Sequence, residues 1–308
     1  MGAGRYAPSP SGELHVGNLR TAVLAWLFAR STGRDFLLRV EDLDRARAGA
    51  EEVQLADLHA IGIDWDGAAV RQTERAEGYD AAIAALQQAG LLYECFCTRR
   101  DIAEAPSAPH AAPGAYPGTC RELNEAERAS RRQLRPAALR LRTDVVQFTI
   151  TDTLHGPYTG VVDDFVVLRN DGVPAYNLAV VVDDVLQGVD QVVRGDDLLP
   201  STPRQGYLAT LLSGLGGDFH GAKLPEYVHV PLVLNEHGQR LAKRDGSVTL
   251  AQLEPEGFPP QRVRARLLES LGLPGASLTA ALAAFDPSDL PRDPWVFGGF
   301  TAGTPGMQ

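Results

Sequence analysis

The segment PSPSGELHVGN, residues 8–18, places one histidine and two glycines directly before an apolar stretch with helical spacing. Backbone N–H groups and the positive end of the dipole at a helix start attract anions. Gly12 and Gly17 would let a ligand approach the backbone closely, and His15 could donate to a phosphate. The spacing fits neither GxGxxG nor GxxxxGK[ST]. The residues alone leave two interpretations, an anion site and a turn with an incidental histidine.

A second group with possible chemistry consists of the three cysteines, Cys95, Cys97 and Cys120. Cys-x-Cys with a third cysteine in a following loop is typical of a structural zinc site, which needs a fourth ligand. Imidazole is the commoner ligand, so chemistry alone favours His110. Residues 101–118 are rich in Ala and Pro and could not fold alone, so a metal would stabilise them. The alternative is three unlinked buried thiols.

Alternating strands and helices must position these groups. Because strand and helix patterns alternate over the first 90 residues, we expect an α/β chain of βαβ units with a parallel sheet. Residues 138–175 contain short strands separated by turns, which predicts an antiparallel insertion. The expected strands lie at 4–7 and 35–42, and the expected helices at 18–31, 50–62, 75–90, 175–186, 202–215 and 260–273.

Composition restricts the class of protein. The chain has 308 residues, of which 44% are hydrophobic and 22% charged, as in globular domains. No apolar run is long enough to span a bilayer, the first residues lack a signal-peptide pattern, and three cysteines favour a reducing cytoplasm over a disulfide framework. A net charge of −10 argues against non-specific nucleic-acid binding. The basic run 127–142 remains a candidate for phosphate contact, with a solvated helix and strand as its alternative.

Several longer motifs carry a resemblance to a known family. They are PSPSGELHVGN at 8–18, RVEDLD at 39–44, GIDWD at 62–66, PAYNLAVVVDD at 174–184, VVRGDDLLPSTPRQ at 192–205 and RLAKRDG at 240–246. In this order they resemble class I aminoacyl-tRNA synthetases of the glutamate branch, with a Rossmann-like catalytic domain. The sequence is most similar to the short paralogues of glutamyl-tRNA synthetase.

The resemblance implies a reaction and its partners. Glutamate and ATP, with Mg²⁺, would form glutamyl-adenylate without tRNA. The glutamyl group would then pass to the cyclopentenediol of queuosine, at the wobble position in the anticodon loop of tRNA(Asp). One alternative is a truncated glutamyl-tRNA synthetase that charges the 3′ end of tRNA. Another is a non-catalytic paralogue that binds glutamate, nucleotide or tRNA and regulates.

The resemblance also assigns roles to residues. Arginines suit the two carboxylates of glutamate, and a carboxylate suits its ammonium group. His15 and Lys243 would be the catalytic residues, because they would act on the phosphates of ATP. The ATP site would comprise His15, Gly17, Asn18 and Lys243, and the glutamate site Arg5, Ser9, Glu41, Tyr176 and Arg194. The family pattern makes Tyr116 the fourth zinc ligand, beside Cys95, Cys97 and Cys120.

Two positions depart from the family's pattern. Ala242 replaces the serine of the usual Lys-Leu-Ser-Lys-Arg loop, while Arg240 and Lys243 keep its charges. A hydrogen bond within the loop would be lost, and the main phosphate contact would be retained. Val180 stands where glutamyl-tRNA synthetases usually have asparagine, so we expect one substrate hydrogen bond fewer and weaker glutamate binding.

The expected organisation follows from these assignments. Residues 1–92 and 173–250 would form the two halves of the catalytic domain, and residues 93–172 a zinc-containing, partly antiparallel insertion. Residues 251–308 would form a short helical region and tail, with no anticodon-binding domain. We expect a cytoplasmic monomer that makes no contact with membranes.

Overall fold

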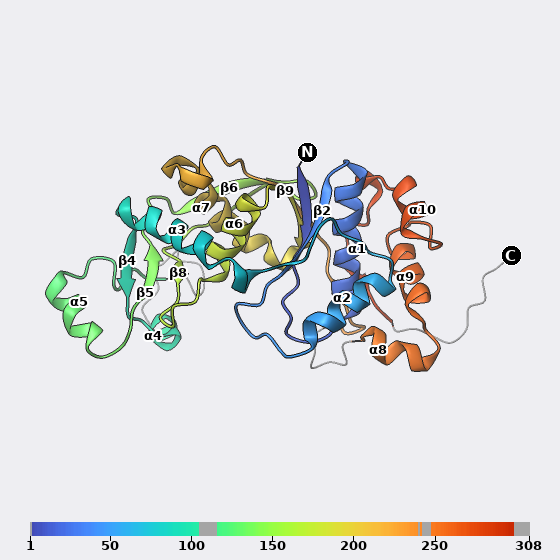
Figure 1. Cartoon of the computed structure of the whole chain (residues 1–308), viewed down its shortest axis with the longest axis horizontal. Coiled ribbons are helices and arrows are strands. Elements are labelled where there is room, and N and C mark those ends of the chain that lie inside the picture. Colours follow the sequence, from blue (N-terminus) through green and yellow to red (C-terminus); the bar gives the residue numbers. More distant parts are fainter. Residues whose placement is uncertain (1, 105–115, 240, 242–247, 299–308) are drawn as a thin grey trace. The chain divides into compact units, whose positions relative to one another are not determined.

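The computed structural model describes residues 2–104, 116–239, 241 and 248–298 (Figure 1). The predicted roles of His110, Arg240, Ala242 and Lys243 therefore lie outside the described residues. The chain divides into two compact units. Within the described part, no helix is both long enough and apolar enough to cross a membrane.

Unit 1 comprises residues 1–71, 191–198 and 227–308. Its strands lie in the order β3-β2-β1-β9-β10, and the β1–β2 and β2–β3 pairs are parallel, as predicted. These strands are β1 Ala3–Tyr6, β2 Asp35–Val40, β3 Val70–Arg71, β9 Val189–Gly195 and β10 Glu226–Val230; a small parallel pair consists of β11 Val233–Leu234 and β12 Trp295–Val296. The helices are α1 Val16–Ser31, α2 Ala50–Ala60, α8 Leu250–Leu253, α9 Pro260–Glu269 and α10 Leu278–Ala283.

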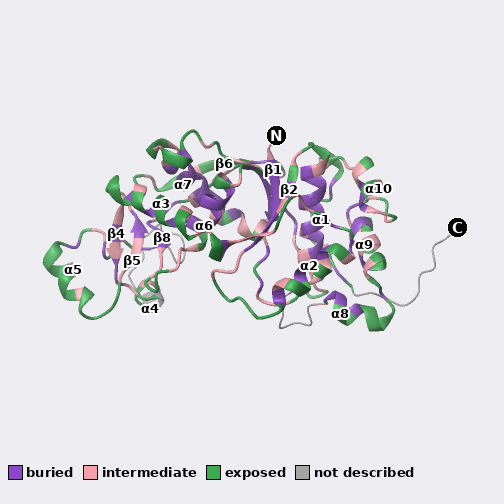
Figure 2. Cartoon of the chain, viewed as in Figure 1, coloured by how far each residue is buried: buried purple, intermediate pink, exposed green. Residues whose placement is uncertain are grey.

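Helix α1 is the central helix of unit 1. It packs against β1, β2, α9 and α10, and most of its residues are buried (Figure 2). Its one strongly buried cation, Arg20, donates from Nη1 to the carbonyl of Pro231 and from Nε to the hydroxyl of Ser270. A helix buried this widely is held in place over its whole length, so the residues at its N-terminus have a fixed position.

Unit 2 comprises residues 72–190 and 199–226. Strands β4 Leu92–Cys95, β5 Ala138–Leu141 and β8 Val166–Leu168 form an antiparallel sheet, and β6 Gln147–Asp152 pairs with β7 Gly156–Val161 in an antiparallel hairpin. The antiparallel character predicted from the turns is thereby confirmed. The helices are α3 Ala76–Gln88, α4 Arg99–Glu104, α5 Glu125–Arg132, α6 Tyr176–Leu186 and α7 Thr202–Leu215.

Candidate active site and metal centre

The HVGN turn begins α1, and His15 is its N-cap. Nδ1 of His15 accepts from the backbone N–H groups of Gly17 and Asn18, at 3.1 and 3.3 Å. The side chain of Asn18 accepts in return from the backbone N–H of His15, which completes a capping box. Since an accepting ring nitrogen carries no proton, the imidazole is neutral and its proton is on Nε2. The histidine, rather than an anion, satisfies these two N–H groups, and the ring offers Nε2–H as its donor.

Gly17 leaves room for the His15 ring. A Cβ added at Gly17 would lie 3.0 Å from Cε1 and 3.1 Å from Nδ1 of His15, closer than side chains normally approach. The second glycine of the motif is therefore explained by the histidine beside it. The sequence indicated close approach by a ligand, and in the structure the close neighbour is His15.

The PSPSG turn is held by Gln54, which lies outside the sequence motifs given above. Gln54 lies on α2 and is buried, and its Nε2 donates to the carbonyls of Ser9 and Gly12 at 3.0 and 2.6 Å. The backbone N–H of Glu41 donates to the carbonyl of Pro8 at 2.9 Å, which joins this turn to the end of β2. Ser9 itself is exposed. No local pattern marks Gln54, because its partners are about 40 residues away in the chain.

The HVGN turn is also joined to the segment that follows the RLAKRDG motif. The backbone N–H of Val16 donates to the carbonyl of Val248 at 3.1 Å, and His15 and Thr249 form an isolated antiparallel bridge. A backbone contact therefore joins the HVGN turn to residues 248–249, which are more than 220 residues away in sequence. Lys243 lies five residues before Val248 and outside the described residues.

The strand order brings three predicted glutamate ligands onto neighbouring elements of unit 1. Arg5 is on β1, Glu41 follows β2, and Arg194 is near the end of β9, and these three strands are adjacent. Arg5 and Arg194 are 4% and 6% exposed. Buried arginines offer strong, directed binding to carboxylates. This arrangement could bind a small dicarboxylate.

Two further buried side chains contact these predicted glutamate ligands. Nε of Arg194 donates to Nε2 of His229 on β10 at 3.1 Å. Nη2 of Arg39, on β2, lies 3.6 Å from Oε1 of Glu41. His229 and Arg39 are fully buried, and neither was among the predicted site residues.

Tyr176 and Val180 belong to α6 in unit 2. Tyr176 is the first residue of the helix and is 43% exposed, whereas Val180 is buried in its apolar face. The helix is anchored by the buried Asp183, which accepts from Gln72, Arg75 and Tyr79. The first aspartate of the VVDD motif is thus engaged in holding α6 to α3.

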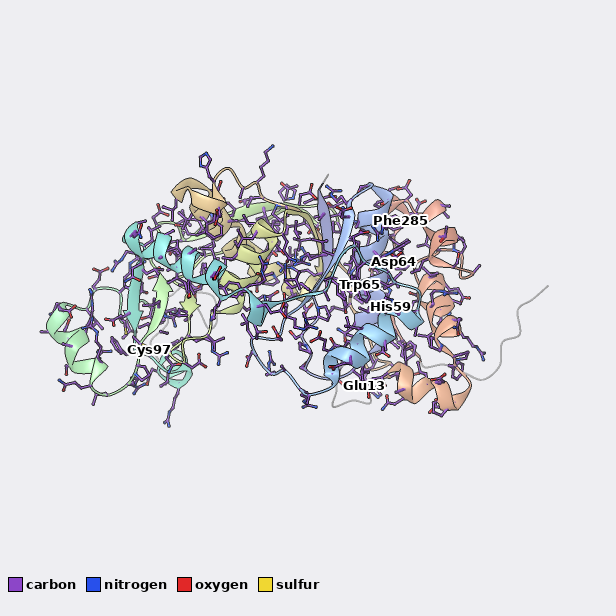
Figure 3. All side chains as sticks on the ribbon, viewed as in Figure 1. Glu13, His59, Asp64, Trp65, Cys97 and Phe285 are labelled. Atoms are coloured by element: carbon purple, nitrogen blue, oxygen red, sulfur yellow. The ribbon has the colours of Figure 1, made fainter. Side chains whose placement is uncertain are left out.

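A carboxyl group lies beneath the turn that precedes His15. The carboxylate of Asp57, on α2, accepts from the backbone N–H of Leu14. Burial, with a smaller contribution from the nearby Glu13 (labelled in Figure 3), raises the pKa of Asp57 to about 6. Its Oδ2 is buried and has no hydrogen-bond partner among the described residues.

The predicted sulfur cluster forms within unit 2. The three Sγ atoms of Cys95, Cys97 and Cys120 lie within 4.8 Å of one another, and Cys97 and Cys120 are 3.6 Å apart. The hydroxyl oxygen of Tyr116 is 3.5 Å from Sγ of Cys95 and 4.0 Å from Sγ of Cys97, and it accepts from the backbone N–H of Cys120. The buried aromatic residues Tyr93 and Phe96 pack around the cluster.

These distances fit a tetrahedral metal ion. Bonds of ~2.3 Å to sulfur and ~2.0 Å to oxygen place sulfur atoms ~3.8 Å apart and sulfur–oxygen pairs ~3.5 Å apart. Burial and the neighbouring Cys95 raise the pKa of Cys97 to about 12 without an ion. Burial also raises the pKa of Cys95, but the Tyr116 hydroxyl and Arg140 outweigh it, so this pKa lies below its usual value. The donor set suits zinc, and Tyr116 is in position to be the fourth ligand.

The basic run 127–142 is bonded largely to protein groups of unit 2. Arg128 donates to the carbonyl of Leu123, Arg132 pairs with Glu94 and Glu125, and Arg135 donates to the carbonyl of Phe96. Several of these arginines therefore fasten α5 and the segment after it to the cysteine-containing segment. Phosphate contact by this run stays a prediction.

Comparison with known protein families gives a match over most of the chain. Residues 3–287 match the family described as tRNA synthetases class I (E and Q), catalytic domain. The chain is 65% identical over 296 residues to a protein of Nocardia farcinica called glutamyl-Q tRNA(Asp) synthetase, a match that covers 96% of this chain and 93% of that protein. A protein of Deinococcus radiodurans with the same name is 44% identical, covering 88% of this chain and 90% of that protein.

Solved structures give a consistent result. A glutamate tRNA ligase from Elizabethkingia meningosepticum, in complex with its amino acid, matches with a TM-score of 0.78 and 27% identity over 96% of this chain and 67% of that chain. The glutamate-tRNA synthetase of Elizabethkingia anophelis matches with a TM-score of 0.79 and 27% identity, over 97% of this chain and 68% of that chain.

Proposed function

Because the chain belongs to the class I tRNA synthetases for glutamate and glutamine, we propose that it activates glutamate with ATP and transfers the glutamyl group to queuosine in tRNA(Asp). The observation that carries this proposal is the 65% identity, over nearly the whole chain, to a protein called glutamyl-Q tRNA(Asp) synthetase. The buried Arg5 and Arg194, on strands of the same sheet as the strand that precedes Glu41, agree with glutamate as the amino acid.

The first step would be the formation of glutamyl-adenylate. An oxygen of the α-carboxylate of glutamate attacks the α-phosphorus of ATP, the bond to the bridging oxygen breaks, and pyrophosphate leaves. Arg5 and Arg194 would bind carboxylate groups, Glu41 the ammonium group, and Ser9 and Tyr176 would add polar contacts. Such a site accelerates the reaction through positioning and charge stabilisation.

The ATP-binding residues would act on the phosphates. Nε2–H of His15 would donate to a phosphate oxygen, and the capping contacts with Gly17 and Asn18 would hold the ring in place. Lys243, in the RLAKRDG motif, would stabilise the negative charge of the leaving pyrophosphate. Mg²⁺ bound with ATP would neutralise further phosphate charge.

The second step would be transfer to the modified base. A hydroxyl of the queuosine cyclopentenediol attacks the carbonyl carbon of glutamyl-adenylate, AMP leaves, and the hydroxyl proton passes to AMP or to solvent. Single-stranded loop bases are what proteins read best in RNA, which suits an acceptor in the anticodon loop. We further propose that the protein acts as a monomer.

Zinc would have a structural role in unit 2. Cys95, Cys97, Tyr116 and Cys120 would be its ligands, which fits the distances among their donor atoms. Four protein ligands leave no open coordination position for substrate, so the metal would stabilise the fold of this segment rather than take part in the reaction.

Glutamate-dependent exchange of labelled pyrophosphate into ATP, measured without tRNA, tests the activation step. We expect exchange with glutamate and none with aspartate or glutamine. No exchange with glutamate in the presence of Mg²⁺ would contradict tRNA-independent activation. A second candidate, charging of the 3′ end of tRNA, is favoured by the likeness to glutamate tRNA ligases; the site of transfer distinguishes the two.

A further inference from the structure

The side chain of Arg140 lies against the proposed metal centre and has no role in the function described above. Arg140 is on β5, is 6% exposed, and places its guanidinium carbon 3.6 Å from the centre of the Tyr116 ring. A guanidinium in this position attracts the electron-rich ring face and limits rotation of the ring. The contact therefore fixes where the Tyr116 oxygen lies.

A hydrogen bond to the backbone fixes the orientation of the Arg140 side chain. Its Nη1 donates to the backbone carbonyl of Asp164 at 2.6 Å. The carboxylate of Asp164 accepts in turn from Tyr93, Arg121 and Thr143. Arg140 is thus held from a part of unit 2 that is already rigid through buried hydrogen bonds.

One donor of Arg140 has no partner of its own. Nε is fully buried and makes no hydrogen bond to any described residue, a costly state for a charged group. In the β4–β5 register, Tyr93 pairs with Arg140 and Cys95 pairs with Ala138, so Arg140 and Cys95 are diagonal neighbours on one face of the sheet. The Cys95 sulfur is thus a nearby acceptor, a weak one as a thiol and a strong one as a metal-bound thiolate.

Charge balance around the cluster agrees with this view. Three thiolates outnumber the two positive charges of a zinc ion, so the occupied centre is anionic even before the Tyr116 oxygen is counted. A second cation, Arg131 on α5, places Nη1 3.7 Å from Sγ of Cys120, and the backbone N–H of Phe96 also donates to that sulfur. Cys120 and Cys95 would each have a positively charged neighbour.

We propose that Arg140 is a positioning residue of the metal centre, which holds the Tyr116 ring in ligating position and donates from Nε to the Cys95 sulfur when the metal is bound. The inference rests on the metal site proposed above. Partners of this kind typically contribute 10- to 100-fold to metal affinity.

The test uses the full chain and compares Arg140→Met with the wild type. Zinc affinity is measured by competition with a chromophoric chelator, and the Co²⁺-substituted protein is examined for its thiolate-to-cobalt absorption. We expect a roughly 10- to 100-fold loss of affinity. We also expect the absorption to move to longer wavelength, because the Cys95 sulfur loses a hydrogen-bond donor.

Arg142→Met is the matched control. Arg142 lies two residues further along the chain, 5.1 Å over the ring of Tyr93, and its guanidinium bonds to Glu122 and to the carbonyl of Arg121. The Arg142→Met variant should have unchanged metal affinity and an unchanged cobalt spectrum. If Arg140→Met does not fold, Arg140→Lys, which keeps the charge but lacks Nε–H, should still shift the spectrum.

The possible outcomes distinguish the positioning role of Arg140 from the existence of the metal site. Unchanged affinity and spectrum in the Arg140 variants would overturn the positioning role, whatever happens to thermal stability. A wild-type chain that binds neither Zn²⁺ nor Co²⁺ would overturn the metal site itself. If Tyr116→Phe still binds the metal and His110→Ala does not, the assignment of Tyr116 as the fourth ligand would be wrong.

Discussion

Nε of Arg194 donates a hydrogen bond of 3.1 Å to Nε2 of His229 in the interior of unit 1. Because the accepting nitrogen carries no proton, His229 is neutral with its proton on Nδ1. The bond fixes the plane of the guanidinium. A carboxylate bound by Arg194 would therefore meet Nη1 and Nη2, which can bind both of its oxygens.

Replacing His229 should weaken the use of glutamate more than that of ATP. In His229→Leu the buried guanidinium loses its acceptor and its orientation, so we expect the KM for glutamate to rise about tenfold or more, with a smaller change in the KM for ATP. His229→Gln supplies another acceptor and should recover part of the loss. His220→Leu, at an exposed position of unit 2, is the control. Equal changes in both KM values would refute the positioning of Arg194.

Adding one methyl group at Gly17 should impair activation. The new Cβ in Gly17→Ala would collide with the His15 ring at 3.0–3.1 Å, so the ring must move. A displacement of this size in a phosphate-binding group typically costs on the order of 10²-fold in rate. Gly214→Ala on α7, where an added Cβ meets nothing within 4 Å, should leave pyrophosphate exchange unchanged. Normal exchange in Gly17→Ala would argue against a role for His15.

The two lysines of the chain, Lys223 and Lys243, offer a direct comparison. Lys243→Ala should slow adenylate formation by about 10²-fold or more, because one stabilising charge on the phosphates is lost. Lys223→Ala should have no effect on the rate. Circular dichroism of both variants checks that they are folded. Full pyrophosphate exchange by folded Lys243→Ala would remove Lys243 from the mechanism.

Asp57 should make stability depend on pH. Its pKa is raised to about 6 in the folded protein, chiefly by burial, so its favourable contribution is complete below its ordinary pKa of 3.8 and is lost as pH rises through about 6. Asp57→Asn should therefore be more stable than the wild type at pH 7.5, by on the order of 1 kcal/mol after screening by solvent. The advantage should vanish near pH 4.

Thermal unfolding across pH 4–8 measures this effect. Asp218→Asn, at an exposed acidic position, serves as the control and should follow the wild type. Parallel curves for the wild type and Asp57→Asn would show that Asp57 does not couple to folding in this range.

The elements of the fold were largely predictable because their signals are local. Helix α1 and strand β2 lie where apolar spacing placed them, and the antiparallel insertion follows from its turns. The cysteine spacing predicted a cluster, and the three sulfurs do lie together. Residue patterns within short stretches of the chain were sufficient for these features.

The contacts that orient the site were not predictable, since they join distant segments. Gln54 holds a turn about 40 residues away, and His229 reaches Arg194 across neighbouring strands. Within the basic run 127–142, whose contact with phosphate stays a prediction, Arg140 is buried against Tyr116 and Arg131 adjoins a sulfur. A sequence shows the charge of an arginine but not the direction in which its side chain points.

The site of glutamate transfer tests the central claim most directly. The full chain is incubated with labelled glutamate, ATP and Mg²⁺, and separately with tRNA(Asp) that contains queuosine, tRNA(Asp) that lacks it, and glutamate tRNA. Nuclease digestion then locates the label. We predict alkali-labile label on queuosine in the tRNA(Asp) that contains it, and no label on the other two RNAs. Periodate oxidation of the free diol before the incubation should abolish this labelling of queuosine. Label on the 3′-terminal adenosine of glutamate tRNA would contradict the account and support charging of the 3′ end.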